Sequence, residues 1–380
     1  MEWGVLGFLF HTFCHTLLKS LEMKMCVSDL FVVRLFVMKL WWLVLVGFVF
    51  WGCSNGNTPQ QDGSSNSTEA GQEMVEETSS GSDAGQDGGQ PGESAQEASA
   101  PDVSGPWQVK LMTFNIRNGV ANDGENHWTK RNTMVFDVIR KDSPDILGLQ
   151  EAWQFQMIAI TDAVPVYVCI GQSRDADTEL GEWSPLCYRK DRWKPAEGEQ
   201  GTFWLSDTPD TPGSKSWGNT LPRIVTWARM VEIATGRSVY VYNTHYDHKS
   251  QNSRLEASKL LVKRILARKD KTAPVVVMGD FNASETNSAI RYLKGEEVSG
   301  EKSSIPLVDT YRVLYPDAKK VGTFNSWTGR TSGSKIDYIF ALPKEQGTIV
   351  KSAEIITTNV DGRYPSDHFP VSATLEFESP

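Results

Sequence analysis

The sequence predicts an α/β fold, of the α+β kind, in which two packed β-sheets are covered by helices. Three observations lead to this prediction. Apolar, β-branched runs recur through the last two-thirds of the 380-residue chain, stretches of helical period lie between them, and polar residues follow the runs at their ends. The front third of the chain does not share this pattern.

The first expected elements lie between residues 109 and 151. Residues 109–116 (VKLMTFNI) and 145–151 (DILGLQE) are apolar runs that predict strands. Between them, residues 129–141 (TKRNTMVFDVIRK) predict a helix with Thr129 as its N-cap. Its apolar residues fall on one helical face: Met134, Val135, Val138 and Ile139.

The remaining elements complete two sheets. Residues 236–245 (GRSVYVYNTH) and 273–282 (APVVVMGDFN) are continuous apolar runs, as in strands buried on both faces. Residues 253–269 between them predict an amphipathic helix, and residues 335–342 (KIDYIFAL) and 371–377 (VSATLEF) predict the last strands. The inward face of that helix holds Leu255, Leu260, Leu261 and Ile265.

Polar residues follow the apolar runs in five short blocks. These are TFNIRNG from Thr113, LQE ending at Glu151, NTH ending at His245, GDFN from Gly279, and SDH ending at His368 in a loop. Strand ends and loops can bring such residues into one cleft. Oxygen ligands with histidines, and no cysteine cluster, indicate a magnesium-type site that acts on phosphate.

The order and spacing of the blocks resemble the endonuclease/exonuclease/phosphatase superfamily, which is DNase I-like. The resemblance covers residues from about Trp107 to Phe377 and includes KIDYIF from Lys335. It implies a four-layer α-β-β-α sandwich with the site at one mouth between the sheets. Residues 201–217 and PRIVTWAR from Pro222 resemble a bacterial branch with some likeness to nocturnin-like deadenylases.

The resemblance also implies a metal site. Glu151 matches the main magnesium ligand of the family, Asn115 helps to place metal and phosphate, and Asp367 can join the ligand shell. The expected cofactor is Mg²⁺ or Mn²⁺. Taken alone, Asn115 is more often a turn residue that caps its own backbone.

Five residues match the catalytic positions of the family. Asp280 and His368 act on the attacking water, and which of them is the general base stays open. Asp337 supports His368, while His245 and Asn282 contact the phosphoryl oxygens. The implied reaction is in-line attack of water on phosphorus without a covalent enzyme intermediate.

Substrate contacts are expected from Asn115, Asn243 and Arg223. Asn243 lies two residues before His245 on the same face of its strand, so we expect it to face the cleft. Arg223 suits phosphate through its planar fork, and a surface ion pair is the alternative. Four tryptophans offer stacking faces for a base or sugar, or are core residues: Trp183, Trp204, Trp217 and Trp327.

The front of the chain predicts export and anchoring. Residues 38–53 (MKLWWLVLVGFVFWGC) resemble a bacterial lipoprotein signal that ends at the lipidation candidate Cys53, with a transmembrane anchor as the alternative. Residues 1–37 are a doubtful N-terminal extension. We therefore expect an extracytoplasmic, membrane-anchored protein at the outer membrane or periplasmic face, with its catalytic domain over residues 106–380.

Residues 54–105 predict a disordered acidic tether, because they hold almost no apolar side chains. They carry ten acidic residues and no Lys or Arg, whereas the rest of the chain after them has 34 of each sign. Most of the formal net charge of −9 thus belongs to the tether. A neutral domain argues against a tight polynucleotide binder without excluding one.

Cys169 and Cys187 lie in two apolar runs that can pair as neighbouring strands. A disulfide and two buried thiols are both compatible with this placement. We favour the thiols, because cross-strand cysteines must also be in register.

These observations predict a metal-dependent phosphoesterase, with a nuclease or exonuclease that cleaves phosphodiesters as the leading class. Sphingomyelinase-like and inositol-phosphatase-like activities are alternatives, and a non-catalytic surface binding protein is an alternative of another class. The expected partners are a phosphate-ester substrate (nucleic acid, nucleotide or phospholipid head group) and the membrane. We expect a monomer without a protein partner.

Overall fold

The computed structural model describes residues 105–176 and 180–378. The predictions for the extension at 1–37, the signal or anchor at 38–53 and the tether at 54–105 concern residues outside this part, apart from Gly105. Within the described part, none of the helices combines the length and apolar character needed to cross a bilayer.

The first sheet combines strands from both ends of the described chain. The strand order is β11 (Thr348–Ile355), β12 (Val371–Phe377), β1 (Trp107–Asn115), β2 (Ile146–Gln150), β4 (Leu186–Arg189) and β3 (Tyr167–Ile170). β1 lies in the interior of this sheet, parallel to β2 and antiparallel to β12.

The second sheet is built from the middle of the chain. The strand order is β5 (Trp193–Trp204), β6 (Ile224–Glu232), β7 (Ser238–His245), β8 (Val275–Asp280), β10 (Asp337–Ala341) and β9 (Val308–Asp309). The central strands β7 and β8 are parallel, and β10 runs antiparallel to β8.

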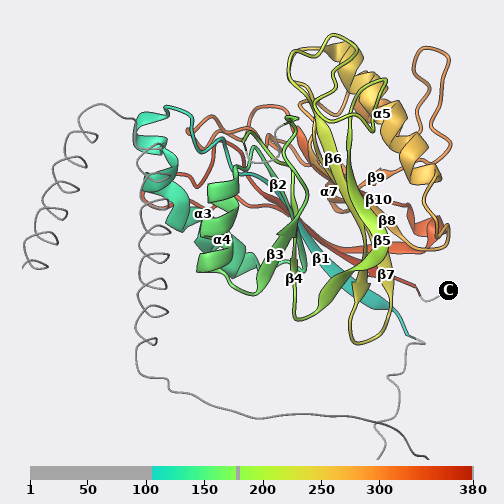
Figure 1. Cartoon of the computed structure of the whole chain (residues 1–380), viewed down its shortest axis with the longest axis horizontal. Helices are drawn as coiled ribbons and strands as arrows, with labels where there is room; N and C mark the ends of the chain where they lie inside the picture. The colour runs from blue at the N-terminus through green and yellow to red at the C-terminus, as the bar shows by residue number, and fades with distance from the viewer. Residues whose placement is uncertain (1–104, 177–179, 379–380) are drawn as a thin grey trace, which may run out of the picture. The chain divides into compact units, whose positions relative to one another are not determined.

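The two sheets pack face to face, and helices cover their outer faces (Figure 1). Alternation along each strand separates the layers: Val276 and Met278 of β8 pack between the sheets, whereas Val275 and Val277 pack outward. This is the predicted four-layer α-β-β-α sandwich with the DNase I-like fold. The helical segments are η1 (Gly124–Asn126), α3 (Trp128–Asp142), α4 (Gln154–Ala163), α5 (Gln251–Leu266), α6 (Ser288–Leu293), α7 (Thr310–Leu314) and η2 (Lys344–Gln346).

Each outer face has its own apolar core. α3 and α4 pack on the first sheet through residues such as Val135 and Ile160, and α5 packs on the second sheet through residues such as Leu261. The prediction that Thr129 caps the first helix was wrong. The N-cap is His127, whose ring nitrogen accepts a hydrogen bond from the Thr129 backbone N–H.

A disulfide joins Cys169 of β3 to Cys187 of β4, which are direct partners in the antiparallel ladder. Our preference for two free thiols was therefore wrong. The disulfide thus joins the two strands directly, close to the ends where the chain leaves β3 and enters β4.

Candidate active site

The polar strand ends meet at one edge of the sandwich. Asn115 at the end of β1 lies beside Gln150 at the end of β2, so Glu151 follows at the same edge. In the second sheet, His245 at the end of β7 aligns with Asp280 at the end of β8, and Asp337 begins β10 opposite Asp280. Parallel pairing in each sheet thus places the ligands of both sheets around one cleft.

The cleft has a volume of about 500 Å³, which is within the range of small-molecule sites. Most of its lining is charged or polar. The lining residues are Arg117, Asn118, Ala121, Glu151, Arg174, Glu182, Leu221, Arg223, His245, His248, Asp280, Asn282, Phe324, Ile336, Asp367 and His368.

Unusual backbone conformations occur where the strands deliver these side chains. Glu151 and Asn282 have φ values of 57° and 48°, in the left-handed region. Gly279 has φ 150°, and a Cβ there would lie 2.1 Å from the carbonyl oxygen of Thr244. Such conformations cost about 1–3 kcal/mol each in non-glycine residues and are concentrated at functional sites.

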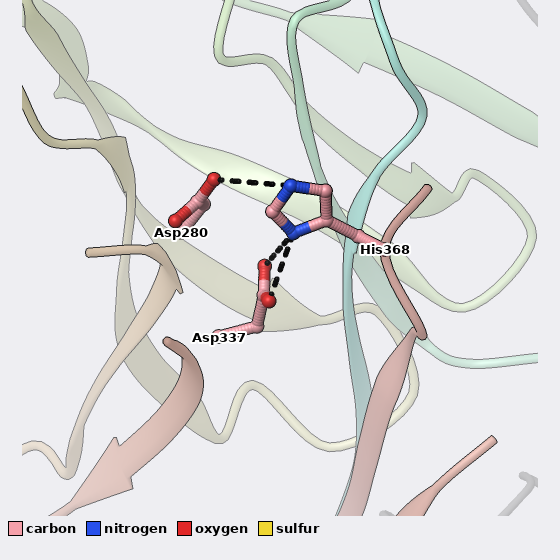
Figure 2. Close-up of side chains that lie close together, drawn as sticks. All are labelled: Asp280, Asp337 and His368. Carbon is pink, nitrogen blue, oxygen red and sulfur yellow. Dashed lines mark hydrogen bonds and ion pairs between the residues drawn. The ribbon is translucent and has the colours of Figure 1, made fainter. Parts of the chain in front are cut away.

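His368 lies between two buried aspartates (Figure 2). Its Nδ1 lies 3.0 Å from Oδ2 of Asp337, and its Nε2 lies 3.8 Å from Oδ2 of Asp280. Asp337 therefore fixes the orientation of the imidazole and leaves Nε2 turned toward Asp280. The ring of Phe324 packs edge-on against His368, with 5.1 Å between the ring centroids.

Burial and charge shift the protonation of this group. Burial alone lowers the pKa of His368, but the carboxylates of Asp337 and Asp280 outweigh it and raise the pKa above its usual value. Burial, and then the charge of Asp337, raise the pKa of Asp280. A cationic imidazole thus faces a carboxyl group that accepts protons more readily than an exposed aspartate.

His245 has the opposite protonation preference. Burial, and then the positive charges of Arg223 and Arg174, lower the pKa of His245 well below its usual value. The imidazole is therefore neutral near pH 7 and keeps one ring N–H to donate. Its Nε2 lies 3.5 Å from Oδ2 of Asp280.

Glu151 and Asp367 form a carboxylate pair on the part of the cleft that belongs to the first sheet. Glu151 accepts hydrogen bonds from the Asn115 amide at 3.2 Å and the Asn118 backbone N–H at 2.9 Å. Burial, and then the charge of Glu151, raise the pKa of Asp367. The Asn115 amide also donates to Asp280 at 3.0 Å and so joins the two halves of the site.

This donor set fits a divalent cation. The guanidinium of Arg117 is 3.9 Å from Glu151 and 3.8 Å from Asp367, distances too long for hydrogen bonds. Its short bonds go to Asp123, at 2.9 Å each. Two partly buried carboxylates that form only these longer ion pairs with Arg117, and an amide oxygen beside them, are the oxygen ligands that Mg²⁺ or Mn²⁺ prefers.

A second group is also able to hold a metal ion. Asp280, Asp337 and His368 each offer a ligand atom, and these atoms lie within 4.8 Å of one another. Both oxygens of Asp337 lie within 3.3 Å of His368 Nδ1, however. This hydrogen bonding favours a proton-handling role over metal ligation for the His368–Asp337 pair.

Asn282 lines the cleft. Its backbone N–H donates to Asp280 at 2.8 Å, and its side-chain amide donates to the Tyr246 carbonyl at 3.0 Å. One amide N–H is thereby used to fix the side chain. The second N–H is available to a ligand.

The expectation that Asn243 faces the cleft was wrong. Its amide donates to the carbonyl oxygens of Leu149 and Pro185, each at 2.8 Å, and accepts from Gln150 at 2.7 Å. The side chain is fully buried between the sheets. Asn243 does share a strand face with His245, but at Asn243, two residues before His245 in β7, that face points into the sandwich. Its role is to connect the two sheets.

Arg223 lies in the cleft, immediately before β6. It is 3% exposed, and its Nη2 lies 3.0 Å from Nδ1 of His248. The alternative of a surface ion pair does not apply to so buried a side chain. Among the described residues that line the cleft there is no tryptophan, and Phe324 is the large apolar aromatic residue present.

Sequence reasoning missed part of the cleft. Arg174 and Glu182 come from the β3–β4 loop and form a 2.6 Å ion pair, and Asn118 donates to Glu182 at 3.0 Å. Arg117 was also not anticipated, although it lies in the TFNIRNG block. For Arg174 and Glu182 the only signal was the charged stretch SRDADTELGEW between two apolar runs, and no periodicity marks such loop residues.

Comparisons with known proteins agree with this geometry. The profile of the Endonuclease/Exonuclease/phosphatase family matches residues 112–368. Mouse Nocturnin is 23% identical over 299 residues, which cover 71% of this chain and 66% of that protein. The chain thus spans just under two-thirds of the length of this curated relative.

Two solved structures from Bacteroides thetaiotaomicron are similar throughout the sandwich. An endonuclease/exonuclease/phosphatase family protein is 30% identical with a TM-score of 0.61, covering 72% of this chain and 96% of that chain. A mannosyl-6-phosphatase is also 30% identical with a TM-score of 0.61, covering 70% of this chain and 99% of that chain. The chain therefore belongs to the endonuclease/exonuclease/phosphatase family, whose members are hydrolases acting on phosphoester bonds.

Proposed function

We propose that this protein is a metal-dependent phosphoesterase in which water attacks phosphorus in line with the leaving oxygen. The observation that carries the proposal is the convergence of Asp280, His245 and His368 around one point of the cleft, beside the Glu151–Asp367 carboxylate pair. This arrangement provides a proton acceptor, hydrogen-bond donors and ligands for a cation within one site.

Different residues take the proton of the attacking water and stabilise the negative charge on the phosphoryl group. Asp280 orients the attacking water and takes its proton, because Oδ2 is directed at the cleft by Asn115. His368, held by Asp337, stabilises the negative charge on the phosphoryl group through Nε2. Neutral His245 and the free amide N–H of Asn282 donate to the phosphoryl oxygens as they gain charge.

Glu151, Asn115 and Asp367 would hold Mg²⁺ or Mn²⁺, which supplies positive charge to the phosphoryl and leaving oxygens. The proposed ligands belong to the first sheet and its flanking loops, and the proton-handling groups belong mainly to the second. Correct packing of the two sheets is therefore a condition for activity.

The nature of the alcohol that leaves is a separate question. Similarity to a mannosyl-6-phosphatase supports a phosphatase reading, and similarity to Nocturnin supports the deadenylase-like reading from the sequence. The balanced charge of the domain and the lack of a tryptophan in the described cleft favour a small substrate over a polynucleotide. Phospholipid head groups remain an alternative that the proposed membrane anchor at Cys53 supports.

Hydrolysis of p-nitrophenyl phosphate and bis-p-nitrophenyl phosphate tests the proposal. We expect the purified protein to release p-nitrophenol from at least one of them with Mg²⁺, to lose activity with chelator, and to regain it when Mg²⁺ is restored. A panel of polynucleotides, nucleotides, sphingomyelin, inositol phosphates and sugar phosphates then ranks substrates. Binding of these compounds without any turnover would contradict the proposal and favour a non-catalytic binding protein.

A further inference from the structure

Several ionisable groups in or beside the cleft have no part in the proposed mechanism. They are the partly buried Arg174 and Glu182 from the β3–β4 loop, the buried Arg223 before β6, and, after β7, the buried Asp247 and the exposed His248. We call these five residues the polar wall. The wall adjoins the catalytic group, because the charges of Arg223 and Arg174 act on His245.

Arg223 is the most unusual member of the polar wall. Its side chain is almost fully buried, yet Nε and Nη1 have no hydrogen-bond partner among the described residues. Its contact with Asp247 is a 3.9 Å ion pair, longer than a hydrogen bond. A buried donor without a partner costs about 1–3 kcal/mol, so these N–H groups are suited to a ligand.

Acceptors lie beside these donors. Asp247 uses Oδ1 to accept from the backbone N–H groups of Lys249 and Ser250, whereas its buried Oδ2 has no hydrogen-bond partner among the described residues and only the 3.9 Å ion pair with Arg223. Arg174 bonds Glu182 through Nη1, and its buried Nε also has no partner among the described residues. The polar wall therefore presents unused donors and an unused acceptor side by side.

The charges of the polar wall balance. Two arginines oppose two carboxylates, so the wall offers no excess positive charge for a second phosphate. A hydroxyl group both donates and accepts hydrogen bonds and carries no charge. An alcohol with several hydroxyl groups can therefore satisfy the unused atoms of the wall without adding charge.

We propose that the polar wall is a subsite for the alcohol part of the substrate, and that the substrate is a phosphate ester of a small, hydroxyl-rich alcohol such as a sugar. This inference rests on the proposed function, since the phosphate is placed by the catalytic group. Glu182 and Arg223 are then specificity-determining residues. Sites built to bond substrate hydroxyls discriminate strongly against analogues that lack them, because their own buried groups are left unpaired.

Selectivity between matched monoesters tests the inference. The substrates are mannose 6-phosphate or glucose 6-phosphate and n-hexyl phosphate, which has six carbons and no hydroxyl groups. We expect kcat/KM to favour at least one sugar phosphate by about 10²-fold or more. Glu182→Gln and Arg223→Met should each reduce this ratio at least about tenfold, while Arg140→Met, on the exposed side of α3, should leave it unchanged.

A binding measurement separates this inference from the proposed function. In the Asp280→Asn protein with Mg²⁺, calorimetric titration should show tighter binding of the sugar phosphate than of n-hexyl phosphate, and Glu182→Gln should remove the difference. Equal binding and equal kcat/KM for both ligands would overturn the subsite while leaving the phosphoesterase intact. Selective binding by a protein that hydrolyses no phosphate ester would overturn the proposed function and leave the subsite standing.

Discussion

At the scale of single residues, Glu151 shows how the backbone presents a charge. Its left-handed backbone conformation turns the carboxylate away from the direction of β2. The Asn115 amide and the Asn118 backbone N–H then hold the carboxylate by hydrogen bonds. Glu151→Gln keeps the shape and one acceptor oxygen but removes the charge that a cation needs. We expect turnover to fall about 10²–10³-fold and the Mg²⁺ concentration for half-maximal rate to rise.

Steady-state rates across a Mg²⁺ titration, with thermal melts alongside, check this prediction. Glu125→Gln is the matched control, because Glu125 is an exposed surface glutamate paired with Lys130. A Glu151→Gln protein with near-wild-type turnover would remove Glu151 from the metal site.

His368 is expected to act on the phosphate and water rather than on the metal. His368→Ala should therefore lower turnover about 10²–10⁴-fold while the Mg²⁺ dependence of the residual rate changes little. Rate measurements over the same Mg²⁺ range distinguish the two effects. A large loss of Mg²⁺ affinity would instead support ligation by the Asp280, Asp337 and His368 group.

Asn243 should matter for stability. Asn243→Ala leaves two buried carbonyls and the Gln150 amide with fewer partners, so the free energy of unfolding should fall by about 2–4 kcal/mol. Urea denaturation measures the loss, with Asn252→Ala on the exposed face of α5 as control. A change below about 0.5 kcal/mol would mean that the sheets are not joined by this side chain.

Several residue-level features were not predictable from the sequence for physical reasons. The blocks around Glu151, His245, Asp280 and His368 stand out because each follows an apolar run. Asn243 lies on the same face of its strand as His245, so the sequence pattern alone predicts that it also faces the cleft. Only the packing of the second sheet against the first shows that its side chain lies between the sheets. Arg174 and Glu182 belong to a loop, where no periodicity links a residue to a position in space.

At the scale of elements, the sequence predicted which segments form strands, but not the register in which neighbouring strands pair. Runs such as VVVM of β8 are buried on both faces and predict a central strand directly. The pairing of Cys169 with Cys187 depends on the register of β3 against β4, which apolar content alone does not set. The predicted start of the first helix was also wrong, because histidine is not among the residues usually found at an N-cap.

The disulfide should stabilise the β3–β4 element. Its cysteines are 18 residues apart, and closing a loop of this size is worth about 3 kcal/mol in the chain-entropy account. The Cys169→Ser/Cys187→Ser protein should therefore be about 3 kcal/mol less stable in urea. Reductant should lower the stability of the wild type by a similar amount and leave the double variant unchanged; a wild type indifferent to reductant would contradict the prediction.

At the scale of the whole molecule, charge is unevenly distributed along the chain. The acidic excess lies in residues 54–105, and the domain after them is balanced. Such a domain gains little from electrostatic attraction to polyanions. Its selectivity must come from the short-range contacts of the cleft, and we expect its activity on small esters to depend only weakly on ionic strength.

Membrane attachment is the remaining prediction from the sequence. If Cys53 carries the lipid, Cys53→Ser should move the protein from the membrane fraction to a soluble or unprocessed form. Cell fractionation with and without detergent, followed by detection of the catalytic domain in each fraction, measures how the protein is distributed between membrane and soluble fractions. Ser64→Ala in the tether is the control, and unchanged detergent-dependent attachment of the Cys53→Ser protein would favour a transmembrane anchor.

The position of β12 affects how the protein can be made. This strand ends at Phe377, yet it pairs with both β1 and β11 in the interior of the first sheet. During translation, domains generally fold as units and long-range strand pairs form late. A growing polypeptide thus lacks the strand that completes this sheet until residues 371–377 have been added, so we expect products that stop before residue 371 to be inactive.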